Sequence, residues 1–383
     1  MPRFIAFYLP QFHPTPENDK WWGKGFTEWT NVAKAKPLFR GHYEPRIPAD
    51  LGFYDLRLPE VREEQAQMAR DAGVEGFMYW HYWFGNGKQI LERPFKEVLQ
   101  TGKPDFPFCL GWANESWTNK SWTNKRSMVR ENILLEQTYS KEDYIAHFNY
   151  VLPAFKDPRY ITVDGKPLFY VYRPLNLPDI DEFLSLWRKL AVENGLKGIH
   201  FVAMTANTSY RKIGEIGKGE VRIPPTNEAG LYYQYLLDKG FDAVNSRGGT
   251  RAEILSTGRL MYFFRTAIES LFKIKLLKKY NQKNINKNLL VEEDKWENVY
   301  PTIVPNWDRS PRAGKESTIY VNSTPKVWGE VIDKAIEVVS EKQQEHQIVF
   351  IKSWNEWGEG NYLEPDMKYG KSFLDELSKR LKK

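Results

Sequence analysis

The chain has 383 residues and a formal net charge of +6, and 15% of its residues are aromatic. This charge is mild for the length, and no concentrated basic patch accompanies the motifs, so nucleic acid is not an expected partner. The single cysteine, Cys109, excludes an intramolecular disulfide and fits a reducing compartment. No run of about 18 apolar residues occurs, and the apolar start at 2–8 is too short for a signal peptide, so we expect a cytoplasmic protein without a membrane-spanning helix.

Eight short apolar runs predict eight strands, and most of the segments between them have helical patterns. In chain order the predicted strands are 3–8, 76–82, 106–112, 168–172, 200–205, 243–246, 302–306 and 348–353. Strands that alternate with helices are typical of repeated βα units. Eight such units predict an α/β fold, a single (β/α)8 TIM-type barrel that forms one domain over residues 1–383.

Helices are expected where the apolar residues recur every three to four positions. The segment 58–72 has this spacing and ends at Gly73, and 179–194 begins with an acidic turn. The segment 325–342 opens with proline and follows Thr324, a good N-cap. The acids at 179 and 181 are explained by their place at a helix start, where the helix dipole favours negative charge.

Two segments interrupt the regular alternation. Residues 13–50 form a long N-terminal loop rich in Trp, Pro and Gly, and long loops in a compact domain are usually functional. Residues 247–300 form an irregular insertion before strand seven, with a basic amphipathic stretch at 260–280. This stretch fits a surface helix over the barrel, or a contact with a membrane surface or with polysaccharide-assembly enzymes.

The active site of such a barrel lies at the C-terminal ends of its strands, and these ends are rich in polar and aromatic residues here. Carboxylates, His, Arg and Trp gather there, whereas the opposite ends look ordinary, and this asymmetry predicts an enzyme. Arg309 and Arg312 follow strand seven on this rim. The candidate substrate-binding residues are Glu28, Trp29, His81, Trp83, Asn114, Glu115, Trp117, Trp307, Asp308, Trp354 and Asn355.

Glu356 and Glu359 follow the last predicted strand and are the candidate catalytic residues. They lie three positions apart in Trp-Asn-Glu-Trp-Gly-Glu-Gly, at 354–360. Paired carboxylates perform acid/base chemistry on acetals, and tryptophans give flat apolar faces for sugar rings. Burial beside the tryptophans would raise the pKa of one carboxyl and leave it as the acid, but the sequence does not say which. Glu115 is a rival for direct chemistry, and a surface turn with chance acids is the bland alternative.

No metal or cofactor site is expected. The six histidines are scattered without the HxH or HExxH spacing of metal sites, and neither a GxGxxG nor a P-loop motif occurs. Cys109 lies in the middle of a predicted strand and is interpreted as a core residue.

Four motifs resemble those of the WbsX-type glycosyltransferases of lipopolysaccharide and polysaccharide biosynthesis, also called glycoside hydrolase family 99-like. They are the segments at 7–14, 22–29, 112–115 and 354–360. The resemblance extends over almost the whole chain. It implies an oligo- or polysaccharide substrate and a role in making cell-surface polysaccharide.

A more distant resemblance links the 354–360 motif to the family 99 endo-acting α-mannosidases. It implies that Glu356 is the base that activates the sugar's own 2-hydroxyl, giving a 1,2-anhydro intermediate, and that Glu359 is the acid/base. Such a route retains the anomeric configuration. Gly358 departs from the hydrolases, which commonly carry a larger residue there. Two alternatives stay open: a nucleotide-sugar-dependent glycosyltransferase and a non-catalytic glycan-binding protein.

Overall fold

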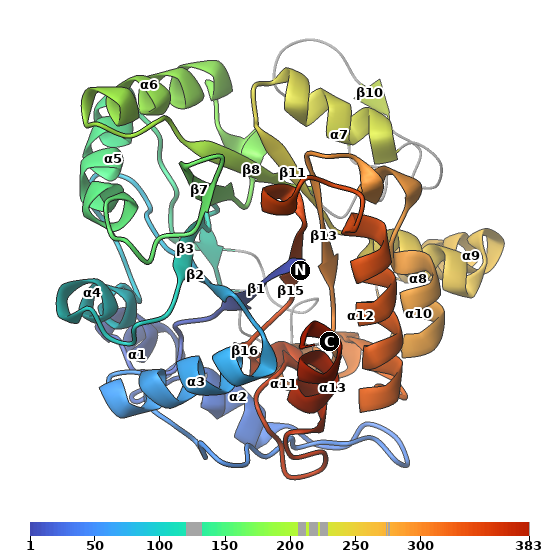
Figure 1. Cartoon of the computed structure of the whole chain (residues 1–383). Helices are drawn as coiled ribbons and strands as arrows, with labels where there is room; N and C mark the ends of the chain where they lie inside the picture. Colours follow the sequence, from blue (N-terminus) through green and yellow to red (C-terminus); the bar gives the residue numbers. More distant parts are fainter. Residues whose placement is uncertain are drawn as a thin grey trace.

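Eight parallel strands close a barrel with helices around it (Figure 1). The computed structural model describes residues 1–119, 132–205, 212–213, 221–222, 229–272, 274 and 276–382. The barrel strands are β1 (Arg3–Tyr8), β2 (Gly76–His81), β3 (Phe108–Trp112), β7 (Lys166–Val171), β8 (His200–Met204), β11 (Ala243–Ser246), β13 (Val299–Ile303) and β15 (Ile348–Ile351). Pairing of β1 with β15 and of β3 with β7 closes the ring. The predicted barrel fold is confirmed.

Large aromatic side chains fill the barrel interior. The Phe7 ring lies 5.3 Å from Trp80, 5.5 Å from Tyr170 and 5.4 Å from Phe350. Because successive strand residues point to opposite faces, the positions between these pack outward against the helices. One strand is displaced from its expected place: 302–306 was expected, but β13 ends at Ile303, and the chain beyond it turns into the rim.

Three helices around the barrel match the predicted segments: α3 (Pro59–Ala72), α6 (Ile180–Glu193) and α12 (Pro325–Val339). The others are α4 (Arg93–Thr101), α5 (Lys141–Phe155), α7 (Ala229–Asp238), α10 (Gln282–Leu289) and α13 (Ser372–Leu381). Gly73 ends α3 with φ 86°, a conformation that glycine adopts without strain. The Thr324 side chain accepts a hydrogen bond from the Val327 backbone N–H and caps α12. No helix in the described part of the chain is long and apolar enough to cross a membrane.

Shorter elements decorate the barrel. The small strands are β4 (Trp117–Thr118), β5 (Ile133–Leu135), β6 (Thr162–Val163), β9 (Lys212–Ile213), β10 (Val221–Arg222), β12 (Lys278–Asn281), β14 (Thr318–Val321), β16 (Asn355–Glu356) and β17 (Asn361–Tyr362). The N-terminal loop carries two short helices, α1 (Pro16–Trp22) and α2 (Glu28–Lys34). Thr15 caps the N-terminus of α1, and a capping box stabilises the N-terminus of α2. The N-terminal loop is therefore more ordered than a structureless loop.

The insertion at 247–300 is mostly helical, so the expectation of an irregular segment was wrong. It contains α8 (Gly249–Thr257), α9 (Arg259–Leu271), β12 and α10. The two first helices are separated only by Gly258, whose φ is 86°. These helices were not predicted because the apolar residues of α9 are exposed and do not form a face that packs against the core. Within the basic stretch, residues 273 and 275 lie outside the described residues.

Candidate active site

Glu356 and Glu359 lie together at the C-terminal end of the barrel. The chain leaves β15 and forms the short strand β16, which ends at Glu356, and then a 3-10 turn, η5 (Trp357–Glu359). The side chains of both glutamates are 11% exposed. Two carboxylates are therefore placed in a largely water-excluded site, where they need charged partners.

Arg312, on the short helix α11 (Ser310–Ala313), joins the two carboxylates. Its Nη1 lies 3.1 Å from Oε1 of Glu356 and 3.0 Å from Oε1 of Glu359. Because both oxygens contact one nitrogen, they lie within about 6 Å of each other. Retaining glycosidases hold their two carboxyl groups about 5 Å apart, and inverting enzymes about 6.5–9.5 Å apart. The spacing is compatible with a retaining pair.

Glu359 is surrounded by positive charge. Besides Arg312, Nε of Arg309 lies 3.1 Å from its Oε1, and Nζ of Lys352 lies 3.4 Å from its Oε2. Burial by itself would raise the pKa of Glu359, but Arg309, Lys352 and Arg312 outweigh it and hold the pKa well below its usual range. The side chain is ionised in this arrangement.

A third carboxylate reaches Arg312 from the N-terminal loop. Oε1 of Glu28 lies 2.9 Å from Nε of Arg312, and the Glu28 side chain is fully buried. Burial raises the pKa of Glu28, and Glu356 and Glu359 add to that rise, while Arg312 opposes it. The Glu28 carboxylate fills the space that a side chain at position 358 would need, because a Cβ added to Gly358 would lie 2.6 Å from Cδ of Glu28. The glycine is therefore required by the close approach of Glu28.

Lys352 and Trp307 lie side by side at the mouth. Nζ of Lys352 is 4.2 Å from the centre of the Trp307 ring, a cation–π contact. Burial, helped by Arg247, lowers the pKa of Lys352 to about 8 against the opposing effect of Glu359 and Glu356. Trp307 is half-buried, so part of its ring stays open to a ligand.

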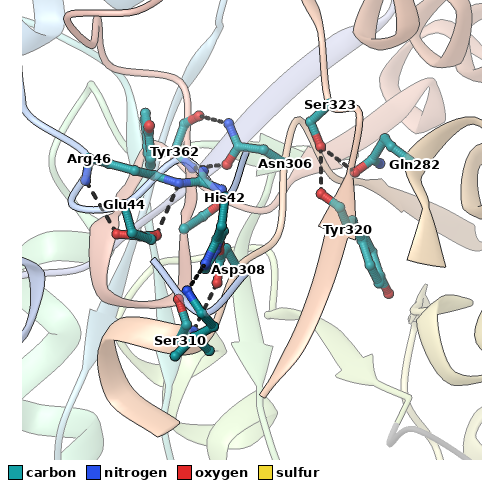
Figure 2. A network of polar contacts seen from close by, with 12 residues as sticks. His42, Glu44, Arg46, Gln282, Asn306, Asp308, Ser310, Tyr320, Ser323 and Tyr362 are labelled. Carbon is teal, nitrogen blue, oxygen red and sulfur yellow. Dashed lines mark hydrogen bonds and ion pairs between the residues drawn. The ribbon is translucent and has the colours of Figure 1, made fainter. Parts of the chain in front are cut away.

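Asp308 lies beneath this rim in a buried polar network (Figure 2). Its Oδ2 is 2.6 Å from Nε2 of His42 and 3.4 Å from Nη2 of Arg46, and its side chain is not exposed. The Asp308 N–H donates to the Glu359 carbonyl at 2.8 Å, and Arg46 donates to the Gly360 carbonyl at 3.1 Å. Asp308 therefore fixes the backbone that carries Glu359 and does not present its carboxylate to a substrate.

The same network contains three groups that could offer ligands to a metal ion: His42, Glu44 and Asp308. His42 accepts from the Leu38 N–H through Nδ1, at 3.0 Å, so its hydrogen is on Nε2 and points at Asp308. Arg46 already supplies a positive charge to both carboxylates. Burial raises the pKa of Glu44 to about 8, with Arg46 opposing and Asp308 adding to the rise. Hydrogen bonds and one arginine thus account for the cluster.

His81 and Trp83 face away from the barrel mouth. Nε2 of His81 lies 2.9 Å from Nε2 of His147 on α5, and the Trp83 ring stacks on His147 at 4.8 Å. Burial lowers the pKa of His81 to about 3. Both side chains pack between β2 and α5, where a substrate at the mouth cannot reach them.

Trp29, Trp354 and Asn355 are buried beneath the site. Trp29 packs against Trp357 at 5.5 Å, and Trp354 packs against Phe77 at 5.1 Å. The Asn355 amide accepts from the Leu9 N–H at 2.8 Å and donates to the Leu9 carbonyl at 3.1 Å. These residues tie the turn that carries Glu356 and Glu359 to β1 and do not form open sugar platforms.

Of the residues after β3, Asn114 and Trp117 are buried and hold neighbouring segments, whereas Glu115 lies at the surface. Asn114 donates to the Arg173 carbonyl at 2.9 Å and accepts from its N–H at 2.7 Å, and Trp117 packs edge-on against Tyr82 at 5.3 Å. Glu115 has a 40% exposed side chain and pairs with Nε of Arg173 at 2.8 Å. Of the predicted binding residues, Glu115 and Trp307 remain the ones that a substrate can reach.

Residues 4–377 match the model of a protein family described as Glycosyltransferase WbsX. The chain belongs to this family. Two curated relatives, proteins called WxcX from strains of Xanthomonas campestris pv. campestris, are 34% identical over 377 residues. The match covers 97% of this WbsX-family chain and 48% of the relatives, so the chain spans about half the length of the curated relatives it matches.

Solved structures share the fold at low sequence identity. The GH99 endo-alpha-mannosidase from Bacteroides thetaiotaomicron is 15% identical with a TM-score of 0.55, and the match covers 99% of this chain and 96% of that one. A glycoside hydrolase-like protein is 16% identical with a TM-score of 0.61, covering 99% and 94%. The family resemblance is confirmed, and family and barrel together support a carbohydrate-active enzyme.

Sequence reasoning missed Lys352 and did not foresee the role of Arg312 in this WbsX-family site. The signal for Lys352 was available: Phe350 points into the barrel, so the residue two positions later also points inward. No local signal shows that Arg312 would bind Glu28, because the two lie 284 positions apart.

Proposed function

We propose that this chain catalyses cleavage or transfer of glycosidic bonds in a cell-surface polysaccharide or its precursor, with Glu356 and Glu359 as the reacting pair. The observation that carries the proposal is the placement of both carboxylates on Nη1 of Arg312 at the C-terminal end of the barrel. A half-buried tryptophan, Trp307, contacts Lys352, which itself contacts Glu359, and offers a face for a sugar ring.

The ion pairs favour one division of roles. Glu359 has three cationic partners and is ionised, so it suits the base. Glu356 has one ion-pair partner among the described residues, Arg312, and is assigned the acid. This order reverses the one implied by family 99. Glu359 could donate a proton in the first step only if Arg309, Arg312 and Lys352 moved away from its carboxylate.

The reaction on an α-mannoside then balances as follows. Glu359 takes the proton of the 2-hydroxyl, O2 attacks C1, the bond from C1 to the leaving oxygen breaks, and Glu356 protonates that oxygen. An acceptor hydroxyl or water next gives its proton to Glu356 and attacks C1, and O2 recovers its proton from Glu359. Two displacements at C1 retain the anomeric configuration.

The first experiment asks whether the chain turns over glycosides at all. Purified protein is incubated with α-linked manno-oligosaccharides and, separately, with nucleotide-sugar donors plus acceptor, and products are followed by proton NMR. We expect a product of retained configuration from the oligosaccharides, lost in Glu359→Gln and kept in the matched control Glu60→Gln, which changes an exposed glutamate on α3. Turnover with nucleotide sugars alone would overturn the hydrolase-like chemistry, and tight glycan binding without turnover would favour the binding-protein alternative.

A second experiment separates the acid from the base. Aryl α-mannosides with very good leaving groups need no protonation, so the variant that lacks the acid keeps activity on them. We expect Glu356→Ala to retain dinitrophenyl mannoside cleavage, whereas Glu359→Ala loses it. The opposite result would restore the family 99 order of roles.

Transfer from a nucleotide sugar is the second candidate, and one observation favours it. Arg247, half-buried just after β11, has no carboxylate partner among the residues that the structure describes, and its Nη1 donates to Sδ of Met204. It lines a cavity of about 50 Å³ with Lys352, Trp307 and the start of α8, whose N-terminus has no side-chain cap. A diphosphate suits two cations and free backbone N–H groups. Arg247→Ala should then raise KM for the nucleotide sugar.

A further inference from the structure

Helix α9, in the insertion at 247–300, turns its apolar side outward. Leu260 is 88% exposed, Phe264 63% and Leu271 77%. These positions follow i, i+4 and i+11, so they form one stripe along the helix. A surface helix of a globular protein normally turns such a stripe toward the core, and α9 does the reverse.

The polar side of α9 is the side that holds it to the protein. Glu269 is buried, pairs with Nζ of Lys278 at 3.3 Å, and accepts from the Leu276 N–H at 3.1 Å. Arg265 donates to the Tyr280 hydroxyl. The outward apolar stripe is thus fixed in its orientation by charged contacts beneath it.

The apolar surface continues past the end of the helix. Between 260 and 276, eight large apolar side chains are exposed: Leu260, Met261, Phe263, Phe264, Leu271, Phe272, Ile274 and Leu276. Figure 1 shows α9 at the outer edge of the molecule, beyond α8 and α10. An exposed stripe of this length costs solubility unless it has a partner.

Basic residues flank the stripe. Arg259 opens α9 and Lys279 follows it, and both are exposed without a carboxylate partner in the described part of the chain, although Nζ of Lys279 lies 4.5 Å from the centre of the Phe39 ring. The sequence adds Lys273 and Lys275, whereas the single acid of the helix, Glu269, is buried and paired. Apolar side chains flanked by cations match an interface of acyl chains beneath anionic headgroups.

We propose that α9, with Phe272, Ile274 and Leu276 after it, binds the surface of an anionic lipid bilayer, with the apolar stripe inserted among the acyl chains. The occupant is chosen by charge: anionic headgroups complement the basic residues that flank the stripe, whereas a neutral apolar groove on a protein would not. This surface is independent of the proposed catalytic pair, because it shares no residue with it.

Sedimentation with vesicles tests the proposal on the full chain. We expect binding to vesicles that contain phosphatidylglycerol, weaker at high salt, and little binding to pure phosphatidylcholine. Phe264→Ser/Leu271→Ser should weaken partitioning at least about tenfold. The matched control Val192→Ser/Leu231→Ser changes two other exposed apolar residues, on α6 and α7, and should bind like the wild type.

Three outcomes would overturn the proposal. Wild-type protein that stays in the supernatant with anionic vesicles is the first, and equal binding by the α9 double variant is the second. The third is an oligomer, seen by light scattering, that the double variant dissociates while vesicle binding is absent; the stripe would then contact a second copy. Circular dichroism and unchanged turnover of the double variant exclude loss of the fold as the cause.

Discussion

Replacing Gly358 by alanine is expected to break the site from within. The added Cβ would lie 2.6 Å from Cδ of Glu28 and 3.0 Å from Nε of Arg312. Glu28 is fully buried, so its carboxylate cannot swing into solvent and must leave Arg312. Breaking a buried ion pair by displacing one partner costs about 3–5 kcal/mol, and we expect a loss of that size in the free energy of unfolding.

Urea unfolding followed by tryptophan fluorescence measures this loss, from the change in midpoint at constant slope. The control is Gly87→Ala, which has a positive φ of 72° but open space around it, and should cost only about 1–2 kcal/mol of backbone strain. Backbone strain does not apply to Gly358, so its cost reports the overlap with Glu28.

A double-mutant cycle isolates the contact. Glu28→Ala removes the carboxylate that a Cβ at 358 would meet, so Glu28→Ala/Gly358→Ala should be no less stable than Glu28→Ala alone. The interaction energy should then exceed about 2 kcal/mol. Strict additivity, or a cost of Gly358→Ala below about 1 kcal/mol, would refute the assignment of this glycine to the Glu28 approach.

Three further outcomes follow from the geometry. His81 stays neutral in the folded chain down to about pH 3, whereas in the unfolded chain it binds a proton below about pH 6.5. Between pH 6.5 and 5 His81 should therefore contribute roughly 2 kcal/mol to the fall in stability, and urea unfolding should show a fall smaller by that amount in His81→Phe. Lys352→Met removes one cation from Glu359, so the acidic limb of kcat/KM should move to higher pH; an unchanged limb would contradict the ion-pair account. Trp307→Ala should raise KM about tenfold with kcat largely kept, and a loss confined to kcat would argue against a sugar platform.

The barrel could be predicted because its strands are encoded locally. Apolar runs such as Phe4–Phe7 and 348–351 are bounded by polar and turn residues, and each run became a buried strand. The helices with clear caps, such as α12 behind Thr324, were equally visible. The insertion failed as a prediction because α9 turns its apolar side away from the core, so its periodicity does not mark a packed face.

The site was predictable only in part, because the direction of a side chain matters as much as its position. His81 follows Trp80 on β2, and Trp80 points into the barrel toward Phe7, so His81 must point outward. Trp354 looked like a sugar platform but fills the space next to Phe77. The carboxylate pair was visible as a motif, whereas its partners come from distant loops.

Turnover by the Glu359→Gln protein is the most direct test of the central claim that the carboxylates bridged by Arg312 perform the chemistry. The probe is whichever substrate the wild type converts, and affinity is measured in parallel by calorimetry. We expect a rate at least about 100-fold lower with affinity unchanged within a few-fold, while Glu60→Gln on the exposed side of α3 stays near the wild type. A Glu359→Gln protein that turns over at close to the wild-type rate would contradict it.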